Sequence, residues 1–374
     1  MKFLHLSDLH IGKRLREQSL MDDQRYILDE ILKIAADEKP DGVIIAGDIY
    51  DKSVPSAEAV ALFDSFITRL SEMKLKVYAI SGNHDSAERI AFGASLMKHG
   101  GVYFSPVYNG SIEKTTEQDE FGSINIYLLP FVKPAQVREY FPETEINDYT
   151  DAVRATLSNI QIDTAERNII IAHQNVTGAA KSGSEETVIG GLDNVDGSVF
   201  DGFDYVALGH IHGAQNIDGD RIRYCGTPLK YSFSEAAHKK SVTVVTFSEK
   251  GSMEIREIPL VPVRDMRDVS GSFDEIVSGT EKSEDYIRII LSDKSDVMNA
   301  AARLRHLYPN VLEICYSDRA RTDYIVSAAD DDDIRNNPEE IFADFYAAQK
   351  HEKPDAEKMA IMAEIIAEAK EGMK

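Results

Sequence analysis

The chain has 374 residues, 43% of them hydrophobic, which is enough for two or three domains with cores of their own. It carries 64 acidic against 41 basic side chains, a net charge of -23, and an acidic surface repels nucleic acids and anionic membranes unless local cations offset it. The two cysteines, Cys225 and Cys315, are far apart in sequence, which argues against a disulfide scaffold or a zinc ribbon. No apolar stretch is long enough to span a bilayer and the first residues do not resemble a signal peptide, so we expect a cytoplasmic protein.

Apolar, β-branched runs alternate with helical patterns in the first half of the chain. The expected strands are 2–6, 42–46, 76–80 and 168–172, and the expected helices lie around 20–38, 56–74 and 86–98. Strands that are apolar on both faces indicate a sheet covered by helices, so the pattern predicts an α/β fold. Several strand patterns follow one another without helices between 204 and 260, which predicts a largely antiparallel run there.

A change of pattern near 261–271 predicts a domain boundary. We expect a first domain over 1–262, a small strand-helix-strand domain over 263–328, and a C-terminal segment over 329–374. That last segment opens with the acidic stretch from Asp330 to Asp333 and then predicts two helices. The first has an aromatic face and the second an apolar seam that packs on another helix, of a partner or of this chain. The residues concerned are Ile341, Phe342, Phe345 and Tyr346, and then Met359, Met362, Ile366, Ala369 and Met373.

Short polar clusters follow five of the expected strands. They contain Asp8 and His10, Asp48 and Asp51, Asn83 to Asp85, His173, and His210 and His212. Because ligands bind beyond the carboxyl ends of strands in α/β sheets, we expect these clusters to converge. Carboxylate, amide and imidazole groups without thiolate favour manganese, iron or zinc over calcium.

The donors are too many for one ion. Two ions roughly 3.5 to 4 Å apart could divide these donors between them, with Asp48 bound to both. Such pairs of metal ions promote in-line attack on phosphoesters. Asn83 is then expected to be a ligand, and His84 to donate a proton to the leaving oxygen.

Each motif taken singly is weak, because a histidine at the end of a strand is often structural. His5 lies in the middle of an expected strand, and we interpret it as structural. Asp85 is expected to be the N-cap of the helix at 86–98.

The order D-x-H, G-D-x-x-D, G-N-H-D, a single histidine and G-H-x-H resembles the signature of the calcineurin-like dinuclear metallophosphoesterases over roughly residues 1–260. Within that superfamily the stretches FLHLSDLHIGK, AGDIYDKSVPS, SGNHDS and GTPLKYSFSEA look most like the SbcD family, nuclease subunits of bacterial SbcC/SbcD complexes related to Mre-type repair nucleases. The resemblance implies a β-sandwich flanked by helices, a small α+β capping domain and C-terminal helices. Lys52, Ser53 and Asp85 depart from the pattern of the protein Ser/Thr phosphatases.

The resemblance also implies roles for the polar residues. One ion would be held by Asp8, His10, Asp48 and His212, and the other by Asp48, Asn83, His173 and His210. His84 would be the proton donor, and Asp51 occupies a position where relatives carry a residue that supports this donor.

The activity implied is that of a manganese-dependent DNA nuclease in DNA repair, recombination and replication. It would act as a 3′ to 5′ exonuclease on duplex ends and as an endonuclease on single strands and hairpins. The C-terminal helices would bind an SbcC-type coiled-coil ATPase. Helices around 56–72 and 86–98 would form a homodimer within a heterotetramer, although a core-facing stripe would have the same pattern.

Two other functions fit parts of the sequence. The same metal ligands could serve a phosphodiesterase for a small nucleotide, because the site alone does not define what fills the groove. A non-enzymatic scaffold for an ATPase is disfavoured by the intact ligand set. Individual basic residues are better explained as solvated surface charges than as DNA contacts; those nearest the motifs are Lys13, Arg14, Arg16, Lys52 and Lys230.

Overall fold

The computed structural model describes residues 1–185, 193–279, 282–295 and 297–317, with positions 346, 354–355, 358–363 and 365 of the C-terminal segment. The chain forms two compact units. The first comprises Met1–Asp268, Lys282–Arg288 and Tyr308–Leu312, and the second comprises the described residues within Val269–Glu281, Ile289–Leu307 and Glu313–Lys374. The boundary between 262 and 263 that the sequence suggests stays a prediction.

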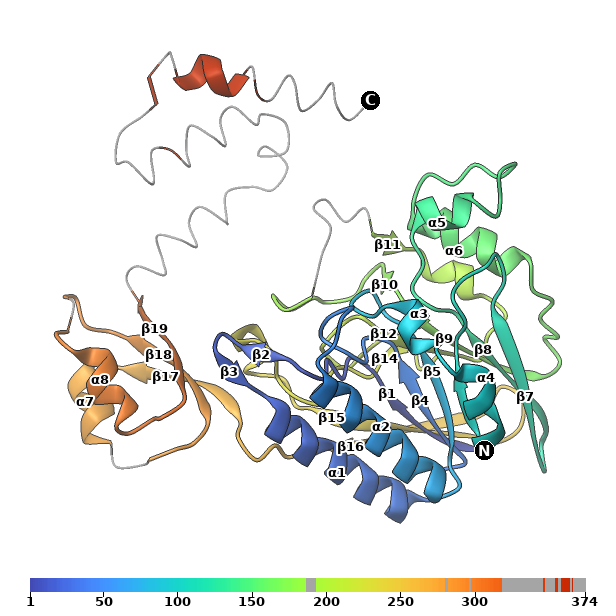
Figure 1. Cartoon of the computed structure of the whole chain (residues 1–374), viewed down its shortest axis with the longest axis horizontal. Coiled ribbons are helices and arrows are strands. Elements are labelled where there is room, and N and C mark those ends of the chain that lie inside the picture. The colour runs from blue at the N-terminus through green and yellow to red at the C-terminus, as the bar shows by residue number, and fades with distance from the viewer. Residues whose placement is uncertain are drawn as a thin grey trace. The chain divides into compact units, whose positions relative to one another are not determined.

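Two six-stranded sheets make up the first unit (Figure 1). One has the order β16-β15-β1-β4-β5-β6, with β1 (Lys2–Leu6), β4 (Gly42–Ala46), β5 (Lys76–Ile80), β6 (Val102–Phe104), β15 (Ser241–Phe247) and β16 (Met253–Pro259). The other has the order β13-β14-β12-β9-β8-β7, with β7 (Glu113–Asp119), β8 (Gly122–Leu128), β9 (Arg167–His173), β12 (Tyr205–Gly209), β13 (Gln215–Asp218) and β14 (Ile222–Tyr224). The parallel strands are β1, β4, β5 and β6 in the first sheet and β8, β9, β12 and β14 in the second. The antiparallel strands are β15 and β16 at one side of the first sheet and β7 and β13 at the two edges of the second.

Alternate side chains of these strands build a core between the two sheets. Phe3 and Tyr78 from one sheet pack with Ile169 and Tyr205 from the other, and all four are fully buried. Because successive side chains of a strand point to opposite faces, the neighbouring residues face outward toward helices. The predicted β-sandwich flanked by helices is therefore confirmed.

Helices cover the outer face of each sheet. α1 (Met21–Glu38) and α2 (Ala57–Glu72) run side by side over the first sheet (Figure 1). Ser56 caps α2 by accepting a hydrogen bond from the backbone of Ala59. The second sheet is covered by α5 (Pro134–Arg138), α6 (Tyr149–Ser158) and η2 (Gly197–Phe200). The remaining short elements are β2 (Arg14–Leu15), β3 (Gln18–Ser19), η1 (Lys98–Gly100), β10 (Asn175–Val176), β11 (Asn194–Val195) and η3 (Phe233–Glu235).

The single helix expected at 86–98 is wrong. The chain forms two short helices, α3 (Ala87–Ile90) and α4 (Ala94–Met97), because Gly93 between them has a left-handed φ of 73°. The N-cap of α3 is Ser86 and not Asp85, since the Ser86 side chain accepts from the Arg89 backbone.

The antiparallel run expected between 204 and 260 is only partly correct. β12 is parallel to both of its neighbours, β9 and β14, whereas β15 and β16 are antiparallel and belong to the other sheet. Local apolar patterns identify strands but do not specify which strands pair, which explains the error.

A three-stranded sheet follows in the last part of the described chain. It has the order β17-β18-β19, with β17 (Met266–Gly271), β18 (Tyr286–Leu291), β19 (Val311–Tyr316) and the helices α7 (Phe273–Ser278) and α8 (Ala300–Arg305). This agrees with the expected small α+β domain. Within the described residues, no helix is long and apolar enough to cross a membrane.

Most of the C-terminal predictions lie outside the described residues. Tyr346, Met359 and Met362 are described and helical. The undescribed positions are Asp330 to Asp333, Ile341, Phe342, Phe345, Ile366, Ala369 and Met373.

Candidate metal centre

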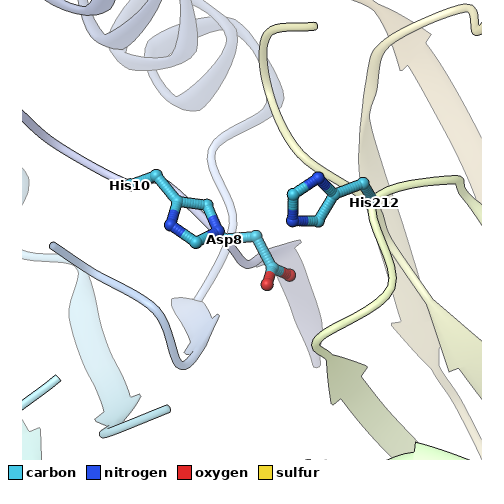
Figure 2. Close-up of side chains that lie close together, drawn as sticks. All are labelled: Asp8, His10 and His212. Carbon is cyan, nitrogen blue, oxygen red and sulfur yellow. The ribbon is translucent and has the colours of Figure 1, made fainter. Parts of the chain in front are cut away.

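The polar clusters meet where parallel strands of both sheets end. Asp8 and His10 follow β1, Asp48 follows β4, Asn83 and His84 follow β5, His173 is the last residue of β9, and His210 and His212 follow β12. Three groups of side chains have possible ligand atoms within 4.8 Å of one another: Asp8 with His10 and His212, His10 with Asp48 and His84, and Asp8 with Asp48 and His173. Figure 2 shows the first group, in which Asp8 and His10 from the loop after β1 meet His212 from the loop after β12.

Asp48 is central to the cluster. Its Oδ2 lies 3.3 Å from His173 Nε2 and 3.7 Å from His10 Nε2. Asn83 Oδ1 lies 3.0 Å from His173 Nε2 and 3.0 Å from His210 Nδ1. The side chains thus form two neighbouring groups of donors with Asp48 between them.

The backbone at the site is strained. Asp8, His10, Asp48 and His210 have φ values of 51°, 42°, 48° and 100°, in the left-handed region that L side chains rarely adopt. Such strain persists only where the surrounding structure enforces it, and it is concentrated at functional sites.

The glycines of the motifs allow the strand ends to approach closely. A Cβ at Gly209 would lie 1.9 Å from the Ala46 carbonyl oxygen, and a Cβ at Gly82 would lie 2.1 Å from Asp48 Oδ1. A Cβ at Gly47 would lie 2.4 Å from His173 Nδ1. Each glycine therefore makes room for a residue of another segment at the site.

The site buries charges and imidazoles together. Asp8 and Asp48 are 0% and 2% exposed. Burial raises the pKa of Asp8. Burial would also raise the pKa of Asp48, but the charges of His173 and His10 outweigh it and lower that pKa.

The site also contains buried nitrogens that lack a hydrogen bond. In the described part of the chain, both ring nitrogens of His10 and Nε2 of His210 are buried without a hydrogen-bond partner. Buried polar atoms are normally satisfied, so a cluster of exceptions needs an explanation. Divalent cations, which bind imidazole nitrogen and carboxylate oxygen, fit these residues.

The proposed proton donor lies beside the cluster. His84 Nε2 is 3.9 Å from Asp48 Oδ2, and its Nδ1 is 3.1 Å from the backbone carbonyl of Asp51. The Asp51 carboxylate contacts Lys13 Nζ at 2.8 Å and lies 3.8 Å from His10 Nδ1. Asp51 therefore contacts His84 through its backbone, and its side chain takes another partner.

Asp85 connects the loops after β4 and β5. Its carboxylate accepts hydrogen bonds from the backbone N–H groups of Ile49, Tyr50 and Gly82 at 2.9 to 3.0 Å. These loops carry Asp48 and Asn83, so Asp85 supports the site where a helix cap was expected.

His5 is structural, as expected. It is 0% exposed, and its Nδ1 lies 2.8 Å from the Tyr205 hydroxyl of the facing sheet. Its partner comes from across the sandwich core, away from the polar cluster.

Residues behind the cluster were not singled out from the sequence. Gln24 Nε2 donates to the backbone carbonyls of Leu9 and His10, and the Tyr231 hydroxyl donates to the Leu9 carbonyl. Glu235 Oε1 lies 3.0 Å from His212 Nδ1. Tyr231 and Glu235 belong to GTPLKYSFSEA, and that motif was the only signal in the sequence that pointed to them.

Comparison with known families agrees with the fold. Residues 1–214 match the family model described as calcineurin-like phosphoesterase. The match covers more than half of the chain, which therefore belongs to the calcineurin-like phosphoesterase family, and this family indicates a metal-dependent phosphoester hydrolase.

The C-terminal part matches a second family model. Residues 262–350 match SbcD_C, described as the type 5 capsule protein repressor C-terminal domain. A phosphoesterase domain followed by this domain is the organisation of an SbcD-type nuclease, as the sequence motifs predicted.

Two solved structures are similar to a large part of the chain. A dimetal phosphatase from Danio rerio has 13% identity and a TM-score of 0.41, with 70% of this chain and 96% of that chain covered. A protein of Thermus thermophilus has 13% identity and a TM-score of 0.38, with 68% of this chain and 98% of that chain covered.

Proposed function

We propose that the chain is a manganese-dependent DNA nuclease that shortens duplex ends in the 3′ to 5′ direction and cuts single strands and hairpins. The observation that carries this proposal is the convergence of two carboxylates, one amide and several imidazoles at the strand ends of both sheets. The SbcD-type C-terminal match favours DNA over a small nucleotide as the substrate.

The proposed ligands divide into two sets that share Asp48. Asp8, His10 and His212 complete one set, and Asn83, His173 and His210 complete the other. Two divalent ions held there would polarise the phosphate and activate water. The Asp51 carbonyl accepts from His84 Nδ1 and so orients Nε2 toward the site, where His84 protonates the leaving oxygen.

The acidic surface requires local cations for DNA to approach. A hollow of about 390 Å³ is lined by Arg14 and Lys52, both on exposed positions, and also by Asp51 and Glu58. Phosphate contacts of this kind position a nucleic acid without reading its sequence. Lys230 is less suited to this role, because Asp265 and backbone carbonyls already bind its ammonium group.

The partners of the protein follow from the same assignment. The C-terminal helices bind an SbcC-type coiled-coil ATPase in the cytoplasm, and two copies of this chain pair within a heterotetramer. The surface around α2 to α4 supports pairing, because Val60, Phe92 and Leu96 are 43%, 81% and 79% exposed. Phe63, Phe66 and Ile90 of the same helices are buried in the core instead.

The test uses the full chain, stripped of metal and then supplied with Mn²⁺. Its substrates are a labelled duplex end, a hairpin, a cyclic nucleotide and a generic phosphodiester. We expect Mn²⁺-dependent shortening of the duplex, reduced roughly 10² to 10⁴-fold in His84→Gln because the proton donor is lost. His99→Gln is the control, since His99 is an exposed histidine away from the site.

Two outcomes would contradict the proposal. Rapid turnover of the cyclic nucleotide with intact DNA would favour a phosphodiesterase for small nucleotides. Full activity of His84→Gln would remove that residue from the mechanism.

A further inference from the structure

The stretch GTPLKYSFSEA ends in a buried carboxylate that the proposed reaction does not use. Glu235 is 0% exposed and lies on the side of the His212 ring that faces away from Asp8 and His10. Its Oε1 is 3.0 Å from His212 Nδ1, and the Ser184 hydroxyl donates to the same oxygen at 2.6 Å. A carboxylate buried this completely needs a reason, because burial of a charge is costly.

The contact between Glu235 and His212 determines which ring nitrogen of His212 carries the proton. A neutral imidazole carries one N–H, and a carboxylate can only accept, so Nδ1 donates to Glu235 and Nε2 keeps its lone pair. Figure 2 shows the His212 ring with one edge toward Asp8 and His10. Carboxylates that hold a metal-binding histidine in this way fix its tautomer and increase its basicity.

Lys240 balances the charge of Glu235. Its Nζ, on a residue only 9% exposed, lies 2.5 Å from Glu235 Oε2 and 2.6 Å from Thr227 Oγ1. The same ammonium group donates to the His212 backbone carbonyl at 2.9 Å. Lys240 thus holds both the carboxylate and the backbone of the histidine that the carboxylate orients.

The other proposed ligand set has no comparable support in the described residues. His173 Nδ1 donates to the backbone carbonyl of Ala46 at 2.8 Å, which is a neutral acceptor. His210 Nδ1 lies 3.0 Å from Asn83 Oδ1, within its own ligand set. A carboxylate behind the ring is therefore specific to the set that contains His212.

We propose that Glu235, paired with Lys240, is a positioning residue that orients His212 and selectively strengthens one of the two metal positions. This inference rests on the proposed function, because it takes His212 as a ligand of the ion bound by Asp8, His10 and Asp48. It predicts that the two positions differ in their dependence on Glu235.

The experiment measures Mn²⁺ binding to the metal-free full chain by calorimetric titration, with bound metal counted after dialysis. Glu235→Gln keeps the size of the side chain and removes its charge. We expect one of two binding steps to weaken 10- to 100-fold, and the other to stay within about twofold. His212→Gln should weaken the same step, and Glu249→Gln, at an exposed glutamate, should leave both steps unchanged.

A second variant guards against misfolding. Glu235→Gln leaves Lys240 buried without its counter-charge, so Glu235→Gln with Lys240→Met restores charge balance. The double variant should unfold at a temperature closer to wild type than the single variant, and it should still show the weakened step.

The outcomes separate this inference from the proposed function. If Glu235→Gln keeps both binding steps of the wild type while His212→Gln loses one, the positioning role of Glu235 is wrong but the site for two ions stands. A wild-type chain that binds fewer than two ions would overturn the dinuclear site, and this inference with it.

Discussion

His5 and the histidines of the metal centre differ in what surrounds them. His5 is buried in the core between the sheets, where burial lowers its pKa to about 3. The Tyr205 hydroxyl and ring are its neighbours, with ring centroids 5.8 Å apart. The same residue type thus serves the core at position 5 and the proposed metal site at position 10.

This burial predicts a pH dependence of stability. Below the unfolded pKa of about 6.5 the unfolded chain binds a proton at His5 that the folded chain excludes, so stability falls as the pH falls toward 3. At pH 5.5 the loss relative to pH 8 is on the order of 1 kcal/mol. Between pH 8 and 5.5, the free energy of unfolding of His5→Gln should fall less than that of the wild type, by about this amount. Urea unfolding of the metal-free proteins measures the difference.

The control for this prediction is His99→Gln, because His99 is an exposed histidine outside the core between the sheets. An identical pH slope in wild type and His5→Gln would show that His5 is protonated in the folded protein.

The ligand candidates were accessible from sequence because each follows an apolar strand pattern in a short motif. Asp8, Asp48 and His210 stand directly after strands that the sequence identifies. Glu235 could not be identified in this way, because it lies 23 residues from His212 in sequence and does not directly follow an expected strand. Its role depends on a contact, and a single sequence does not report contacts.

At the scale of elements, Asp85 joins two strand ends. Asp85→Ala would leave three backbone N–H groups without their acceptor, and each buried unsatisfied donor costs about 1 to 3 kcal/mol. We expect the free energy of unfolding to fall by about 3 kcal/mol or more, the sum of the lower limits for the three donors. Mn²⁺ affinity should also fall, because the loops that carry Asp48 and Asn83 would separate.

Ser86→Ala is the matched control for this prediction. Ser86 caps only the four-residue helix α3, so its loss should cost about 0.5 to 2 kcal/mol and leave Mn²⁺ binding intact. Equal effects of the two variants on metal binding would show that Asp85 supports the site no more than the helix cap Ser86 does.

Element boundaries were predicted best where a long periodic pattern had clear ends. β1, β4 and β5 have the expected bounds, and α1 and α2 agree closely with expectation. The break between α3 and α4 was missed, because one glycine adopted a left-handed conformation that its neighbours in sequence do not require.

At the scale of the whole molecule, one buried ion pair connects distant parts of the first unit. Asp23 on α1 is 2% exposed and accepts two hydrogen bonds from Arg264, at 2.9 and 2.7 Å. The Tyr286 hydroxyl donates to the same carboxylate at 2.8 Å. Residues beyond position 262 therefore complete the core that begins at the first strands.

Arg264→Ala should destabilise this unit strongly. It would leave the Asp23 carboxylate buried without its counter-charge, which costs about 3 to 5 kcal/mol. Arg69→Ala, which breaks the exposed pair with Asp29, should cost about 1 kcal/mol or less. Urea unfolding of both variants checks this, and similar losses would indicate that water solvates Asp23 in the variant.

The order of the motifs, the strands that carry them and the family were determined by the sequence itself, because side-chain periodicity and short spacing are local properties. The pairing of the strands into two facing sheets was decided by the tertiary structure, as were the strained backbone at Asp8 and Asp48 and the carboxylate behind His212. These features depend on residues that are far apart in sequence and meet only when the sandwich closes, since each is stabilised by contacts across segments.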